Sequence, residues 1–228
     1  DEHFDRSKAV NRVRETAVGC LLLLLASCGG GPENGGDAPA TKAVLMDPQS
    51  EEMKTQAPDT YQARFETSGG TILIDVERQL SPNGADRFYN LVRNGYFDGC
   101  RFFRVVPGFI VQWGMNPDPA LTATWQGARI MDDPVQISND RGTLTFAKTG
   151  APNSRSSQMF INLGDNANLD SQGFAPFGRV VSGMDVVDAI NAEYGQQPSQ
   201  QSISERGNEY LNERFPNLDY IKSATIEE

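Results

Sequence analysis

Residues 102–112 read FFRVVPGFIVQ, an apolar run that contains a single cation, Arg104, and ends on an amide, Gln112. Pro107 and Gly108 predict a turn that divides the run into two strand-like halves. Burial of an unpaired arginine is unfavourable, so its place in such a run needs a reason. One interpretation is an edge strand whose Arg104 reaches solvent. The other is a pocket that requires one fixed cation among apolar walls.

The chain around this run predicts a β-rich single domain. Apolar and polar residues alternate along further strand-like segments, of which the first two form a hairpin: 61–66, 71–76, 143–147, 158–163, 176–181 and 220–226. Helices are expected from Ser81-Pro82 to Asn94-Gly95, over 183–190, and as a short amphipathic segment around Tyr210, Leu211 and Phe215. Loops and short strands are expected over 114–140, and a polar loop over 196–201. This order is compatible with a sandwich or a closed barrel.

Residues 1–27 predict a signal peptide, with a basic first part and an apolar stretch from Ala17 to Leu25 that is too short to span a bilayer. The stretch ends in Leu-Ala-Ser-Cys at Cys28, which resembles the bacterial lipoprotein signal. That resemblance implies a diacylated Cys28 at the mature N-terminus. Gly29 after it favours the outer membrane, so we expect a lipid-anchored protein of the bacterial cell envelope that faces the periplasm. An ordinary secretory signal with a chance cysteine is the alternative.

Residues 28–58 are rich in Gly, Pro, Asn and Ala and predict a flexible tether, which leaves 59–228 as the folded domain. With Cys20 in the signal and Cys28 lipidated, Cys100 is the single cysteine left in the mature chain. An intramolecular disulfide is then impossible, and bulky neighbours predict that Cys100 is a small core residue.

The amino-acid composition excludes several kinds of binding and catalytic site. The formal net charge of −10 argues against nucleic-acid binding. The one histidine, His3, falls in the signal peptide, so a Ser-His-Asp triad, a Cys-His pair and a His-rich metal site are excluded. Acidic residues are plentiful but none stands out by its spacing, and we interpret them as solvated surface. No metal or cofactor is therefore expected.

Four motifs in order give the chain from about Tyr61 to Ile226 a resemblance to cyclophilin-type peptidyl-prolyl cis–trans isomerases. They are Phe103–Gln112, Gly142-x-Leu144-x-Phe146-Ala147, Pro152-Asn153 to Ser157–Ile161, and Leu169-Asp170 to Phe177–Val180. The resemblance implies a mainly β fold, a closed eight-stranded antiparallel barrel capped by two α-helices, with a short extra helix near the C-terminus. It also implies that the site lies on the outer face of the barrel.

The same resemblance assigns roles to residues. It makes Arg104 the donor that stabilises the twisted amide. The apolar slot for the proline ring is formed by Phe109, Ile110, Phe160, Leu169 and Phe174. The substrate main chain is held by Gln112, Gln158 and the backbone at Ala147 and Lys148. Taken singly, the slot residues are more often core.

This sequence departs from the family pattern at three positions. Phe103 and Phe174 replace two usual histidines, and Asn168 replaces a tryptophan linked with cyclosporin binding, so we expect weak inhibition by cyclosporin with turnover retained. An insert over about 196–217 has no counterpart in the minimal domain, and the sequence leaves open whether it packs on the barrel or binds a partner.

The expected function is isomerisation of X–Pro bonds in exported or envelope proteins, in support of their folding. The substrates would be proline-containing polypeptides, the membrane contact would be the lipid anchor, and the chain is expected to be a monomer. A binding module that holds proline-containing segments is the first alternative. A structural envelope lipoprotein that has kept the fold for its stability is the second.

Overall fold

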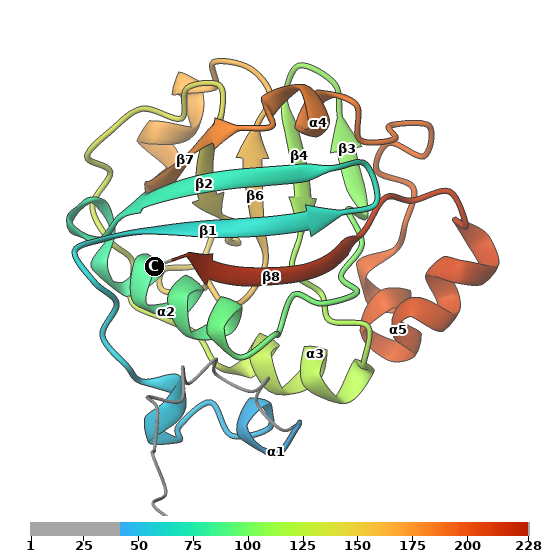
Figure 1. The fold of residues 1–228 in the computed structure, drawn as a ribbon, viewed down its shortest axis with the longest axis horizontal. Helices are drawn as coiled ribbons and strands as arrows, with labels where there is room; N and C mark the ends of the chain where they lie inside the picture. Colours follow the sequence, from blue (N-terminus) through green and yellow to red (C-terminus); the bar gives the residue numbers. More distant parts are fainter. Residues whose placement is uncertain (1–41, 228) are drawn as a thin grey trace, which may run out of the picture. The chain divides into compact units, whose positions relative to one another are not determined.

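The computed structural model of this chain describes residues 42–227. The predicted signal peptide, Cys28 and the first part of the predicted tether lie outside the described residues. One eight-stranded antiparallel sheet curls around the core, in the order β3-β4-β6-β5-β7-β2-β1-β8 (Figure 1). Its strands are β1 (Thr60–Thr67), β2 (Thr71–Glu77), β3 (Arg104–Val106), β4 (Ile110–Trp113), β5 (Thr143–Phe146), β6 (Met159–Asn162), β7 (Pro176–Ser182) and β8 (Ile221–Glu227).

Five α-helices and three 3₁₀ helices surround the sheet: α1 (Lys42–Leu45), η1 (Glu51–Met53), η2 (Arg78–Leu80), α2 (Pro82–Arg93), α3 (Pro119–Gly127), η3 (Ala167–Gln172), α4 (Met184–Asp188) and α5 (Gln200–Arg214). Figure 1 shows α2 running beside β8, and α3 and α5 close to each other. Among residues 42–227, no helix is long and apolar enough to cross a membrane.

The predicted hairpin and strands are confirmed, and their alternation sorts side chains between two faces. Ala63 and Phe65 of β1 are buried in the core, whereas the alternating residues Arg64 and Glu66 are only partly buried. β4 is buried at all four positions because both of its faces are covered. Its Val111 and Trp113 belong to the main core, and its Ile110 belongs to a separate cluster on the opposite face.

The predicted closure of the barrel is not confirmed, because β3 and β8 end the sheet without pairing with each other. Between them the described residues form one isolated bridge, Arg101 with Tyr220. β3 has only three residues, and the amide of Val105 donates to the carbonyl of Gly195 at 2.9 Å. Gly195, the residue just before the C-terminal insert, therefore occupies part of the edge that a closing strand would need.

The helix predictions were partly wrong. Residues 114–140, expected as loops and short strands, contain α3, which begins at the N-cap Asp118 with Pro119 in its first turn. The C-terminal helix begins at Gln200 rather than near Tyr210, with Ser199 as N-cap. It is interrupted at Gly207, where φ is 55° and an added Cβ would lie 2.0 Å from the carbonyl oxygen of Pro117. Only a glycine fits this crossing.

The prediction of a flexible tether up to residue 58 is wrong for residues 42–58. Leu45, Met53 and Ala57 are buried in the main core. The carbonyl of Leu45 accepts from the Trp125 indole at 2.8 Å, and the amide of Ala57 donates to Asp86 at 2.9 Å. The few apolar residues in this polar segment are the ones that pack against α2 and α3, so the folded unit begins before residue 59.

Replacing Leu45 with alanine is expected to lower the free energy of unfolding by about 2–4 kcal/mol, because it leaves a cavity beside Trp125. Urea unfolding of the full chain, followed by circular dichroism, measures this. Met46 is the matched control: it is 41% exposed against 6% for Leu45, and its alanine variant should change stability by less than about 1 kcal/mol. Equal small effects of the two substitutions would contradict the docking of this segment.

Candidate functional site

A groove of about 500 Å³ lies on the outer face of the sheet, on the side away from the main core. It brings together all ten residues to which the family resemblance assigned a catalytic or substrate-binding role: Arg104, Phe109, Ile110, Gln112, Ala147, Lys148, Gln158, Phe160, Leu169 and Phe174. Six further residues line it that the sequence did not single out: Gln126, Arg129, Thr149, Ser154, Ser156 and Gln200.

Strand register places the central side chains in one row. Arg104 of β3 lies opposite Gln112 of β4, Gln112 lies opposite Phe160 of β6, and Phe160 lies opposite Thr145 of β5. Cross-strand partners point to the same face of a sheet, so the register alone sets a cation, an amide and an aromatic ring side by side. No loop conformation is needed to bring them together.

A chain of hydrogen bonds orients the amides beside Arg104. Its Nη1 donates to Gln112 Oε1 at 3.1 Å, Gln112 Nε2 donates to Gln158 Oε1 at 2.8 Å, and Gln158 Nε2 donates to Gln200 Oε1 at 3.2 Å. Gln112 is buried, with 5% of its surface exposed. Gln112 and Gln158 each use their oxygen to accept and their nitrogen to donate, which fixes the orientation of both amides.

The Arg104 guanidinium is half-buried and has no carboxylate within ion-pair distance among the described residues. Burial lowers its pKa from the ordinary value, although an arginine remains charged at any physiological pH. Its centre lies 5.9 Å from the centroid of the Phe109 ring. Within residues 42–227 the Arg104 side chain donates to one protein acceptor, Gln112, so its guanidinium has N–H groups left for a ligand.

An apolar slot adjoins the arginine. Ile110, Phe160 and Leu169 form a buried cluster separate from the main core, with Phe109, Ala147 and Phe174 packed against it. The rings of Phe160 and Phe174 meet edge to face, with centroids 5.8 Å apart. These contacts explain why residues that commonly form a core lie here in a groove: the sheet separates them from the core proper.

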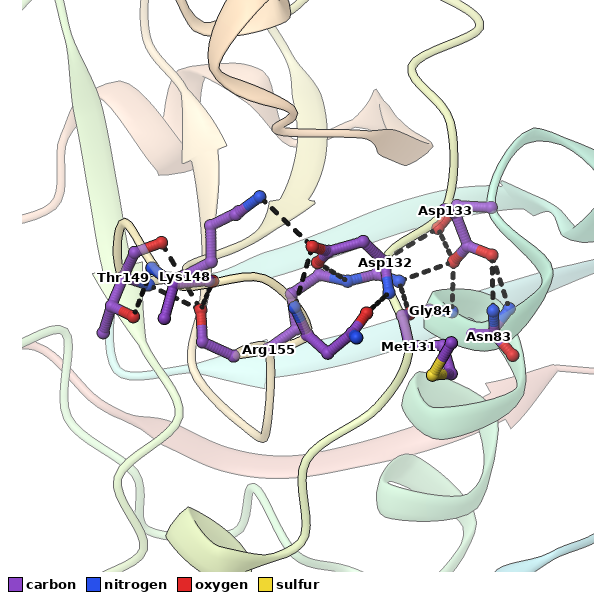
Figure 2. Close-up of polar contacts among 12 residues, drawn as sticks. Asn83, Gly84, Met131, Asp132, Asp133, Lys148, Thr149 and Arg155 are labelled. Atoms are coloured by element: carbon purple, nitrogen blue, oxygen red, sulfur yellow. Dashed lines mark hydrogen bonds and ion pairs between the residues drawn. The ribbon is translucent and has the colours of Figure 1, made fainter.

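A buried ionic network holds Lys148, one of the residues that line the groove (Figure 2). Arg155, 1% exposed, pairs with Asp133 at 2.9 Å and Asp132 at 3.5 Å, and it also donates to the carbonyl of Met131. Asp132 also forms an ion pair with Lys148, with Oδ2 of Asp132 3.5 Å from Nζ of Lys148. Lys148, which lines the groove, is thereby tied to the loop that carries Asp132 and Asp133.

Asp133 joins the same network to the start of α2. It accepts from the hydroxyl of Ser81 at 2.6 Å and from the amide of Gly84 at 3.0 Å. Burial by itself would raise the pKa of the Asp133 carboxyl, but the Ser81 hydroxyl, Arg155 and the Gly84 amide outweigh it and hold that pKa below its ordinary value.

The insert proves to be a wall of the groove. Its α5 packs through Ile203 and Leu211 against Phe103 in a second buried cluster, and its first residue, Gln200, reaches Gln158. Phe103, which departs from the family pattern, thus lies under the insert. No local pattern marked Gln200, since its place depends on this packing.

The structure also locates Cys100 and Asn168, two residues discussed in the sequence analysis. Cys100 is fully buried in the main core, as expected, and burial raises the pKa of its thiol. Asn168 is exposed on η3. Among the described residues, no group of three or more His, Cys, Asp or Glu side chains is placed to hold a metal ion.

Comparison with known proteins gives consistent matches. The family model described as "Cyclophilin type peptidyl-prolyl cis-trans isomerase/CLD" matches residues 62–208. Peptidyl-prolyl cis-trans isomerase A of Dickeya dadantii is 39% identical over 130 residues, which cover 55% of this chain and 68% of that protein. A probable peptidyl-prolyl cis-trans isomerase of Brucella abortus is 34% identical over 168 residues, covering 69% of this chain and 78% of the relative.

A solved cyclophilin-type isomerase from Cryptosporidium parvum superposes with a TM-score of 0.57 and 22% identity, covering 74% of this chain and 98% of the other. At 22% identity this match supports a shared fold and nothing beyond it. It agrees with an antiparallel eight-stranded sheet that curls around one core.

Proposed function

This chain belongs to the cyclophilin-type peptidyl-prolyl cis–trans isomerases, and we propose that Arg104 drives its reaction by stabilising the twisted X–Pro amide above the apolar slot. Family membership makes the chain a peptidyl-prolyl isomerase. The role of Arg104, the nature of the substrates and the place of action in the cell are the proposal.

The observation that carries the proposal is the position of Arg104. It lies in one cross-strand row with Gln112 and Phe160, beside the slot and without a carboxylate partner among the described residues. Rotation about a peptide bond faces a barrier of roughly 18–20 kcal/mol because it breaks amide resonance. As resonance is lost, the nitrogen lone pair localises and becomes a better acceptor. A guanidinium beside it therefore stabilises the transition state more than the planar amide.

The other groove residues supply binding. Ile110, Phe160 and Leu169 bury the proline ring, and this burial holds the ring while the peptide unit before it rotates. Gln112 and Gln158, oriented by their mutual hydrogen bond, and the backbone at Ala147 and Lys148 hold the substrate main chain. Such a reaction needs no nucleophile and no acid–base pair, because no covalent bond forms or breaks.

A prolyl isomerisation assay with an Ala-Pro peptide tests the proposal. Acceleration by the purified chain, proportional to its concentration, is expected, and a folded chain without activity would refute it. The groove also suits a module that only holds proline-containing segments, since its apolar slot can bury a proline ring without the Arg104 donor. Suppression of aggregation separates the two: holding predicts equal suppression by the parent and by Arg104→Ala, and turnover predicts that the variant loses the effect.

We further propose that the protein acts as a monomer on exported proteins at the bacterial cell envelope, held there by a lipid on Cys28. The sequence Leu-Ala-Ser-Cys supports this, and Cys28 itself lies outside the described residues. Incorporation of labelled palmitate by the parent and its loss in Cys28→Ser would agree with the anchor. Equal labelling of the two chains would refute it.

A further inference from the structure

The groove differs in charge from the rest of the chain. The protein carries a formal net charge of −10. The charged residues that line the groove are Arg104, Arg129 and Lys148, with no Asp or Glu among the lining residues. A cleft lined by one sign of charge concentrates field lines and attracts groups of the opposite sign. The net negative charge of the whole chain makes this a local property.

Nearby carboxylates do not cancel this charge. Asp132 and Asp133 are shared between Arg155 and Lys148, a set of two acids and two bases that is neutral as a whole (Figure 2). Neither Arg104 nor Arg129 has an ion-pair partner within the described part of the chain. The groove therefore keeps an uncompensated positive charge. The Lys148 side chain is only 11% exposed, so an anion beside it would be partly shielded from solvent.

Two of these cations, Arg129 and Lys148, lie on the polar wall of the groove, among its uncharged polar lining residues. Arg129 follows the end of α3, Lys148 follows β5, and uncharged polar residues complete this wall: Gln126, Thr149, Ser154, Ser156 and Gln200. An extended peptide advances about 3.3–3.6 Å per residue. With a proline ring in the slot, the side chains of the next few residues of a bound peptide come within reach of this wall.

We infer that Arg129 makes this isomerase select X–Pro segments that carry an Asp or Glu within three residues of the proline. The inference rests on the proposed function, because it takes the slot to hold proline. Arginine suits the role because its planar fork matches the two oxygens of a carboxylate. Arg104, committed to the amide beside the slot, adds to the attractive potential without contacting the acid.

The test compares peptides that share an Ala-Pro core and differ at one position. Glu, Gln or Lys is placed at each of the two positions before the core and the three positions after it, and kcat/KM is measured with the full chain. At one position or more, the Glu peptide should exceed the Gln peptide by roughly three- to tenfold, and the Lys peptide should fall below both. The Glu advantage should shrink as salt is raised, because ion pairs open to solvent are screened.

Arg129→Gln should reduce the Glu-to-Gln ratio at that position by at least about half. Arg214→Gln is the matched control, since Arg214 is an exposed arginine at the far end of α5 from the groove residue Gln200. It removes the same charge and should leave the ratio as in the parent.

Equal rates for the Glu, Gln and Lys peptides at every position, in a chain that isomerises the Ala-Pro core, would overturn the inference and leave the proposed function intact. A Glu preference that Arg129→Gln and Arg214→Gln reduce equally, or one insensitive to salt, would also overturn it. Absence of turnover on every peptide would instead refute the proposed function.

Discussion

Replacement of Arg104 with alanine is expected to lower kcat/KM for an Ala-Pro peptide by about a hundred- to a thousandfold, the loss typical of removing one transition-state donor. The slot and the amides of Gln112 and Gln158 remain, so substrate binding should change less than kcat. Stability should change by less than about 1 kcal/mol, because Arg104 makes one side-chain hydrogen bond and no ion pair within residues 42–227. Isomerisation rates together with urea unfolding curves measure both quantities.

Two further variants make the Arg104 result specific. Arg104→Lys keeps the positive charge but removes the planar fork, so an activity between those of the parent and Arg104→Ala would assign part of the effect to hydrogen-bond geometry. Arg214→Ala removes an exposed arginine away from the groove and should leave activity unchanged. A folded Arg104→Ala chain as fast as the parent would contradict the proposed mechanism.

The groove could be predicted from the sequence because its parts lie in short, regular segments. Once 104–106 and 110–113 pair across the turn at Pro107 and Gly108, period-two alternation places Arg104 and Gln112 on the face away from Val111 and Trp113. The four motifs lie in these short strands and in the turns and the 3₁₀ helix next to them. The family resemblance then favoured an eight-stranded barrel over a sandwich, a choice that alternation alone leaves open.

The features that the sequence did not predict depend on contacts between distant segments. Leu45 and Trp125 meet across 80 positions, and neither residue's neighbours indicate the other. The open edge at β3 depends on the chain returning to Val105 at Gly195, just before the insert, and Gln200 enters the groove because Ile203 and Leu211 pack on Phe103. The α3 helix is a different case: Asp118-Pro119 is a good start signal, and the abundance of loop-forming residues around it obscured the signal.

Arg155 provides the prediction with the largest effect on stability. Arg155→Met should lower the free energy of unfolding at pH 7 by about 3–5 kcal/mol, because it leaves the buried Asp133 carboxylate without its cation. The double variant Arg155→Met with Asp133→Asn removes both charges and should recover part of the loss. Recovery will be incomplete, because Asp133 also accepts from Ser81 and Gly84 at the start of α2.

The pH dependence of this loss follows from the lowered pKa of Asp133. A carboxyl whose pKa is lower in the folded than in the unfolded state stabilises the fold above the unfolded value, about 3.9. That contribution is lost as pH falls through the folded pKa. In Arg155→Met, burial acts on Asp133 without the arginine, so its pKa should rise and the variant should lose stability as pH increases from about 4 toward neutral. The stability gap between parent and variant should therefore be widest near pH 7 and narrow in acid.

Urea unfolding of the parent and of Arg155→Met at pH 7 and pH 4 measures the difference in their free energies of unfolding. A second arginine, which forms an exposed ion pair, serves as the control. Arg179 lies 3.8 Å from Asp140 with both side chains about half exposed, a geometry in which an ion pair contributes at most about 1 kcal/mol. Arg179→Met should thus change stability little at either pH. If Arg155→Met were no more destabilising than Arg179→Met, or if its gap widened in acid, the ionic network would not hold the loop of Asp132 and Asp133 against α2. The loop's contact with Lys148 in the groove wall would then need another explanation.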